Sequence, residues 1–116
     1  MTDEPQRLTI DTVRQADQHV VRLSGEVDLR SSPQLRNVLL DVLAAKPRRL
    51  IVDLAQVGYM DSSGVGTLVE IKRLIERGAG QIVLAGLQPR VRSVFEITQL
   101  DKFFRIAASV DEVGRE

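Results

Sequence analysis

Residues 50–77 read LIVDLAQVGYMDSSGVGTLVEIKRLIER, and the change of pattern within this stretch decides the fold class. Residues 50–54 form a short, almost wholly apolar run, which is typical of a strand covered on both faces. From Ser62 to Arg77 the apolar residues recur at helical spacing. They are Val65, Leu68, Val69, Ile71, Leu74 and Ile75. This stretch therefore predicts a buried strand followed by an amphipathic helix.

Outside this stretch, short β-branched or apolar runs predict further strands. The runs lie at residues 8–13, 19–23, 82–85 and 103–107. Ser24 and Gly25 follow the second of these runs and predict a turn at its end.

Three more helical segments are expected. Ser32 suits an N-cap and Pro33 suits the first helical turn, and the apolar spacing that follows continues until Pro47 ends the helix. Another helix begins at Pro89, and residues 110–113 predict a terminal helical turn.

The alternation of strands and helices predicts parallel βαβ units with right-handed crossovers. The two N-terminal strands are also compatible with antiparallel pairing. The expected fold class is α/β: a mixed, mostly parallel sheet of about four to five strands packed with α-helices.

The composition of the 116-residue chain predicts a single domain over residues 1–116, with its core at about residues 8–113. Lys and Arg together number 16, as do Asp and Glu, so the chain lacks the basic excess typical of nucleic-acid binding. There is no cysteine, and no apolar run is long enough for a signal peptide or a membrane span. We expect a cytoplasmic protein without direct nucleic-acid contacts or a membrane span.

The sequence offers little for catalysis. His19 is the only histidine, so neither a Ser–His–Asp arrangement nor a histidine metal site is expected, and we interpret His19 as structural. The segment 78–80 lacks the spacing of a phosphate-binding loop. We therefore predict no catalytic residues, no cofactor and no metal. The alternative is an enzyme or nucleotide-binding protein that holds phosphate at the edge of a parallel sheet.

Asp61-Ser62-Ser63-Gly64 lies between the buried strand and the helix. Because the N-terminus of a helix has unpaired N–H groups and a positive dipole end, it favours an anion such as a phosphoryl group on Ser62. A purely structural interpretation is also compatible with these residues, with Asp61 or Ser62 as N-cap and with Gly64 and Gly66 permitting close packing on the sheet.

The stretch Asp61-Ser62-Ser63-Gly64-Val65-Gly66 resembles the Asp-Ser-[Ser/Thr]-Gly-Leu-Gly signature of bacterial anti-sigma factor antagonists, the STAS-domain family. Gly25-Glu26-Val27-Asp28 is similar to the family's Gly-Glu-[Leu/Ile/Val]-Asp segment. Residues 78–80, 87–91 and 95–98 fall in the family's order, so the resemblance covers residues 8–113.

The resemblance implies a switch. In this family the unphosphorylated protein binds an anti-sigma factor that is also a serine kinase with a GHKL-type ATPase fold, and thereby frees a sigma factor. The kinase phosphorylates the first Ser of the signature, here Ser62, and the complex dissociates. A metal-dependent serine phosphatase resets the switch. ATP and the metal belong to these partners, and the free chain is expected to be a monomer.

The resemblance also assigns residues. Ser62 is the phosphorylation site, and the partner-binding residues are Asp28, Asp61, Ser62, Ser63 and Gly64. Ser63 supports the helix, with minor phosphorylation there as the alternative. Asp28 comes near Asp61 if their loops emerge at the same sheet edge. Alternatively, Asp61 is only a cap and Asp28 an ordinary turn residue.

Gly64 and Gly66 are interpreted as steric requirements of the loop and the first helical turn. Two positions depart from the family pattern: Val65 replaces the usual Leu, and Gln99 stands where Gly is frequent after a helix. If that position is left-handed, Gln is less favourable there than Gly.

Other members of the family have different roles. STAS domains also serve as subunits of lipid-transport ABC complexes and as scaffolds in stress-signalling assemblies. The identity of the bound partner distinguishes these alternatives from the sigma-regulating switch.

Overall fold

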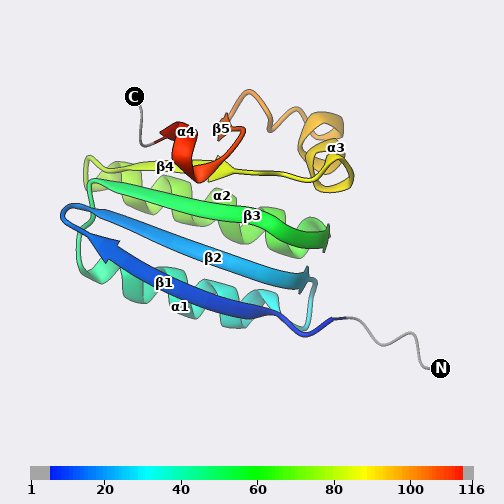
Figure 1. The fold of residues 1–116 in the computed structure, drawn as a ribbon, viewed down its shortest axis with the longest axis horizontal. Coiled ribbons are helices and arrows are strands. Elements are labelled where there is room, and N and C mark those ends of the chain that lie inside the picture. Colours follow the sequence, from blue (N-terminus) through cyan, green and yellow to red (C-terminus); the bar gives the residue numbers. More distant parts are fainter. Residues whose placement is uncertain (1–5, 114–116) are drawn as a thin grey trace.

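The computed structural model describes residues 6–113. In this part of the chain five strands form one sheet in the order of the sequence: β1 (Thr9–Gln15), β2 (Gln18–Val27), β3 (Arg49–Met60), β4 (Gln81–Ala85) and β5 (Arg105–Ala107). The helices are α1 (Ser32–Ala44), α2 (Ser62–Arg77), α3 (Pro89–Ile97) and α4 (Val110–Val113). Strand β1 is antiparallel to β2, and the remaining neighbours are parallel (Figure 1). The predicted α/β class with a mixed, mostly parallel sheet is confirmed.

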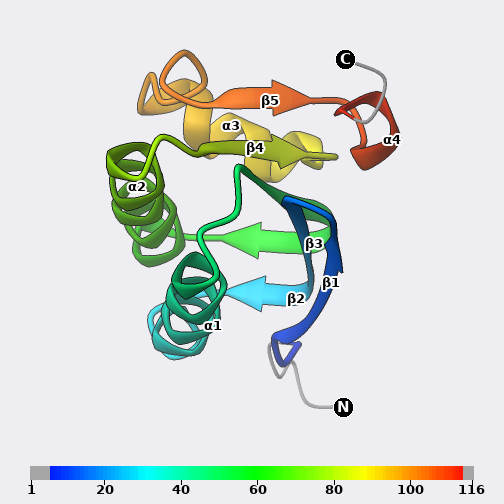
Figure 2. The same cartoon turned by 90° about the vertical axis from the view of Figure 1, so that its left-hand side faces the viewer.

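Helices lie on both faces of this sheet. Figure 2 shows α1 and α2 side by side on one face, and α4 on the other face beside β4 and β5. Arg36 of α1 and Glu70 of α2 form a two-point ion pair across the outer surface, with both N–O distances at 2.8 Å. This pair ties the two helices together on the side away from the sheet.

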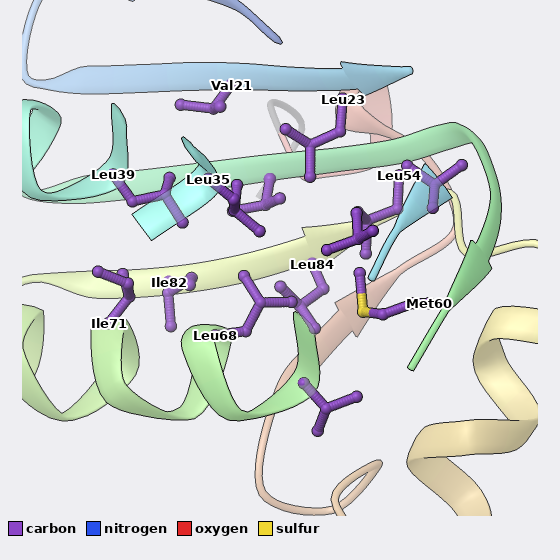
Figure 3. Packing of buried hydrophobic residues seen from close by; sticks show 14 of the residues in the cluster. Val21, Leu23, Leu35, Leu39, Leu54, Met60, Leu68, Ile71, Ile82 and Leu84 are labelled. Atoms are coloured by element: carbon purple, nitrogen blue, oxygen red, sulfur yellow. The ribbon is translucent and has the colours of Figure 1, made fainter. Parts of the chain in front are cut away.

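The main core lies between the sheet and helices α1, α2 and α3. Figure 3 shows Leu35 and Leu39 of α1 and Leu68 of α2 among the sheet's apolar side chains, and all three are fully buried. A smaller cluster fills the opposite face under α4. It consists of Val20, Ile51, Val83, Ala85, Ala107 and Val113. Because β3 is buried on both faces, its first half is apolar almost without interruption, as the sequence predicted.

Strand β2 does not end at residue 23, so the turn predicted at Ser24 and Gly25 is wrong. Gly25 adopts a φ of +111° inside the strand, and the β2–β3 register shifts on either side of it. A Cβ at this position would lie 2.4 Å from the carbonyl oxygen of Arg7, so glycine is required both by conformation and by space. The continuation of β2 gives β3 a partner as far as Met60, well beyond the predicted end at residue 54.

The start of α1 differs from the prediction by one residue. The carbonyl oxygen of Ser31 accepts the first intrahelical bond, from the N–H of Leu35 at 3.2 Å, so Ser31 and not Ser32 is the N-cap. The Ser31 hydroxyl instead binds the preceding loop, where its oxygen accepts from the N–H of Asp28 at 2.9 Å.

Strand β5 begins at Arg105 rather than at residue 103. The N–H groups of Phe103 and Phe104 both donate to the carbonyl oxygen of Leu100 at 3.0 Å, which places these residues in a turn. The ring of Phe104 still joins the main core, packed edge-on against Phe95 with centroids 5.6 Å apart.

The parallel arrangement of strands β2, β3 and β4 determines where the candidate site lies. Strands β2, β3 and β4 all end at one edge of the sheet, and the loops to α1, α2 and α3 leave from this edge. The backbone N–H of Asp61 donates to the carbonyl oxygen of Val27 at 3.1 Å, which joins two of these loops. The condition under which the sequence placed Asp28 near Asp61, that both loops emerge at one edge of the sheet, is thereby met.

Candidate phosphorylation site at the start of helix α2

Asp61 is the N-cap of α2. Its backbone is extended, its carboxylate accepts a hydrogen bond from the N–H of Ser63 at 2.9 Å, and its carbonyl oxygen accepts from Val65 at 3.2 Å. Of the two capping residues that the sequence left open, the structure selects Asp61. The cap satisfies one of the free N–H groups at the helix start.

Ser62 is the first residue of α2 and is exposed. Within residues 6–113 its hydroxyl has no hydrogen-bond partner. Ser63 is less exposed, and its carbonyl oxygen accepts a hydrogen bond from the Thr67 hydroxyl at 3.0 Å. Of the two adjacent serines, Ser62 is therefore the more accessible one.

Gly64 allows the first turn of α2 to lie against the ends of β2 and β3. A Cβ at Gly64 would lie 2.6 Å from Cγ1 of Val27 and 2.8 Å from Cγ of Met60. Gly64 is buried by these contacts, so a steric requirement within the fold explains it. A Cβ at Gly66 would meet no atom within 4 Å, so the prediction of a steric requirement at Gly66 is wrong.

Asp28 organises the neighbouring loop between β2 and α1. Its carboxylate accepts from the N–H groups of Arg30 at 2.9 Å and Ser31 at 3.0 Å, and from the Ser31 hydroxyl at 3.2 Å. These bonds, led by the one from the Ser31 backbone, lower the pKa of Asp28 below its ordinary value. A fixed carboxylate therefore lies in the loop joined to the one that carries Ser62.

Exposed apolar side chains are present at the same edge, and the sequence interpretation missed them. Leu29 follows Asp28 in the loop and is 74% exposed, and Tyr59 near the end of β3 is 37% exposed with the Arg90 guanidinium 5.8 Å from its ring centre. A leucine between Asp28 and Arg30, immediately before a helix start, is the signal from which Leu29 could have been found.

Asp28 also lines an open hollow of about 650 Å³. It is lined by residues of both charges, among them Arg7, Glu26 and Arg30. These positive and negative charges offset one another, and the hollow is wide. It therefore does not have the several positive groups pointing to one place that an anion-binding site needs.

His19, interpreted as structural from the sequence, lies partly buried at the start of β2. Its Nδ1 atom is buried without a hydrogen-bond partner, and its pKa is lowered, first by burial and then by the charge of Arg14. It lies at the start of β2, at the opposite end of the sheet from Ser62.

No helix within residues 6–113 is long and apolar enough to cross a membrane.

These features define a class of protein: a small α/β fold that presents an exposed serine, next to an acidic cap, at the carboxyl edge of its sheet. The family model described as the STAS domain matches residues 9–113. The chain belongs to the STAS-domain family, and the family resemblance of its motifs is confirmed.

Individual relatives agree. The "Anti-sigma-B factor antagonist" of Staphylococcus aureus (strain COL) is 30% identical over 99 residues, which are 85% of this chain and 92% of that protein. An anti-sigma factor antagonist from Mycobacterium paratuberculosis is 26% identical with a TM-score of 0.86, and the match covers 96% of this chain and 94% of that one. The Bacillus cell fate determinant SpoIIAA in the phosphorylated form is 25% identical with a TM-score of 0.71, covering 94% and 98%.

Proposed function

We propose that this protein is an anti-sigma factor antagonist that is switched by phosphorylation of Ser62. The unphosphorylated chain binds an anti-sigma factor that is also a serine kinase of the GHKL type, and a sigma factor is released. Phosphorylation of Ser62 ends the binding, and a metal-dependent serine phosphatase restores it. The names of the relatives support the antagonist role, and the solved phosphorylated form of SpoIIAA supports the switch.

The observation that carries the proposal is the state of the Ser62 side chain. Its hydroxyl is exposed and unpartnered in the described chain, while the neighbouring Asp61 carboxylate is engaged by the N–H of Ser63. A kinase therefore reaches Ser62 without breaking a bond that holds the fold. The helix N-terminus then tolerates the new anion, so the chain stays folded after modification.

Release of the partner follows from local electrostatics. A phosphoryl group adds about −1.5 to −2 charges, and it does so beside Asp61 and at the same sheet edge as Asp28. Burial of this group against a partner requires its desolvation among carboxylates. A loss of about 3 kcal/mol weakens binding more than a hundredfold, since about 1.4 kcal/mol corresponds to tenfold.

The chain itself performs no chemistry in this scheme. ATP is bound by the kinase and the metal by the phosphatase, and the antagonist contributes a surface and an acceptor hydroxyl. It works in the cytoplasm and is a monomer when free. Asp28, Asp61, Ser63 and Gly64 shape the contact surface around Ser62.

The test is phosphorylation with the purified anti-sigma factor and ATP, followed by intact-mass measurement. We expect one phosphoryl group on wild type and on Ser63→Ala, and none on Ser62→Ala. Affinity for the anti-sigma factor is then measured for the unmodified and the phosphorylated wild type, and we expect the phosphorylated form to bind at least about a hundredfold more weakly.

Equal affinity of the two forms would contradict the switch. An ABC-type ATPase in place of an anti-sigma factor as the purified partner would identify the lipid-transport role instead.

A further inference from the structure

Gly66 is a glycine inside α2 that the packing of this chain does not require. A Cβ there would enter open space, in contrast to Gly64, where it would meet Val27 at 2.6 Å. Glycine disfavours a helix because it loses the most backbone entropy on folding. Gly66 therefore destabilises α2 without a packing gain among the described residues, as is expected where a second molecule approaches the helix backbone closely.

The position of Gly66 links it to the candidate site. It follows Ser62 by four residues, so the two lie on one face of α2, one turn apart. A shallow hollow of about 330 Å³ continues along the helix from this point. It is lined by Gly66, Val69, Glu70, Arg73, Leu74 and Arg77.

The charge of this hollow is positive at the end away from Ser62. The carboxylate of Glu70 is already engaged by Arg36 through two bonds of 2.8 Å. In the described part of the chain, Arg73 and Arg77 have no carboxylate within 4 Å. The hollow thus offers two uncompensated guanidinium groups to an acidic ligand.

We propose that the outer face of α2 from Ser62 to Arg77 is a docking groove for an acidic segment of the anti-sigma factor, whose backbone lies against Gly66. The proposal rests on the function proposed above, because its occupant is the partner that contacts Ser62. This face of α2 is about 22 Å long, from 15 residues at about 1.5 Å each, and the hollow occupies its part from Gly66 to Arg77. Stable complexes bury roughly 800 Å² on each partner, far more than one serine loop supplies, and the groove adds contact area continuous with that loop.

The first test is Gly66→Ala, with Gly66→Gln as a larger side chain that also favours a helix. We expect both variants to raise the urea midpoint of the free chain and to weaken binding to the purified anti-sigma factor, by about tenfold for Ala and more for Gln. A substitution that stabilises the fold while it weakens binding is not explained by damage to the chain.

Gly78→Ala is the matched control. Gly78 is the C-cap of the same helix with a φ of −91°, and a Cβ there meets only the Ile75 carbonyl oxygen at 3.6 Å. We expect its affinity for the anti-sigma factor to equal that of wild type.

The second test addresses charge. Arg73→Glu is expected to weaken binding and to flatten its dependence on salt concentration, because an attraction between opposite charges is removed. Arg14→Glu makes the same charge change on exposed strand β1, distant from the groove, and is expected to leave the affinity unchanged.

The outcomes separate the two proposals. If phosphorylation of Ser62 abolishes binding while both Gly66 variants bind like wild type, the groove is overturned and the switch stands. If Gly66→Ala destabilises the free chain, the docking groove is also overturned, because the added Cβ would then not lie in open space. If unmodified and phosphorylated chains bind equally, the switch itself fails.

Discussion

The N–H of Asp61 donates a hydrogen bond of 3.1 Å to the carbonyl oxygen of Val27. This bond joins the end of β2 to the first residue after β3, and it brings the Asp28 loop beside the start of α2. Asp61 uses its carboxylate, its N–H and its carbonyl oxygen to hold the helix start, and the Ser62 hydroxyl takes no part in these bonds.

Asp61 is predicted to act first as a cap. Asp61→Ala removes the acceptor for the Ser63 N–H and should lower the free energy of unfolding by about 1 kcal/mol. Asp61→Asn keeps an acceptor oxygen and should stay close to wild type. Urea unfolding of the three proteins is the measurement, and equal stability of the Ala variant and wild type would contradict the cap.

Gly64→Ala is predicted to destabilise the fold. The added Cβ collides with Val27 and Met60, and overpacking of this kind costs about 1–3 kcal/mol. Gly66→Ala, two residues along the same helix, should instead stabilise the fold by about 0.5–1 kcal/mol.

A double variant checks the cause. Val27→Ala removes Cγ1, the nearer of the two atoms that the new Cβ would strike, so Gly64→Ala with Val27→Ala should be less destabilised than the two single effects added together. Simple additivity would show that another contact is responsible.

The stability of the loop around Asp28 should depend on pH. The pKa of Asp28 is lower in the folded protein than in the unfolded chain, so below the ordinary value of about 3.9 the unfolded chain binds more protons. The stabilisation is complete above that pH and is lost as the pH falls through the lowered pKa. The difference in melting temperature between wild type and Asp28→Ala should therefore be largest above about pH 4 and should shrink in acid. A difference independent of pH would contradict this role of Asp28.

Replacement of Gln99 by glycine should stabilise the folded protein. It follows α3 with a φ of +60°, and the N–H groups of Gln99 and Leu100 donate to Glu96 and Phe95 at 3.0 and 2.7 Å, as in a Schellman motif. The left-handed conformation costs a residue with a Cβ about 1–2 kcal/mol, partly offset by the greater entropy of glycine when unfolded. Gln99→Gly should therefore raise the free energy of unfolding by about 0.5–1 kcal/mol.

Ile97→Gly is the control for this substitution. Ile97 is exposed in the last turn of α3, where glycine brings no conformational gain, so this variant should lose about 1 kcal/mol. Equal effects of glycine at the two positions would contradict the strain at Gln99.

The helices were the most predictable part of the fold. Helix α2 begins and ends where the apolar spacing predicted, at Ser62 and Arg77, and α4 matches its predicted residues. These boundaries depend on interactions within a few residues, such as the bond from the Asp61 carboxylate to the N–H of Ser63. Interactions between residues so close in the sequence can be predicted from the sequence pattern.

The strand ends were less predictable because they depend on distant partners. β3 extends to Met60 since β2 continues beside it, and β2 continues because Gly25 absorbs the shift in register. In the sequence, Ser24-Gly25 is indistinguishable from a turn.

The candidate site also has some properties that the sequence predicts and others that only the tertiary structure determines. The motif and the two candidate caps, Asp61 and Ser62, were readable from the chain, whereas the choice of Asp61 as the cap required the structure. Gly64 and Gly66 have the same chemistry, yet one is enclosed by Val27 and Met60 and the other faces open space. The exposure of Ser62 and the meeting of the Asp28 and Asp61 loops likewise arise from the parallel strands ending at one edge. These properties exist only after folding, because the atoms that create them come from parts of the chain far apart in sequence.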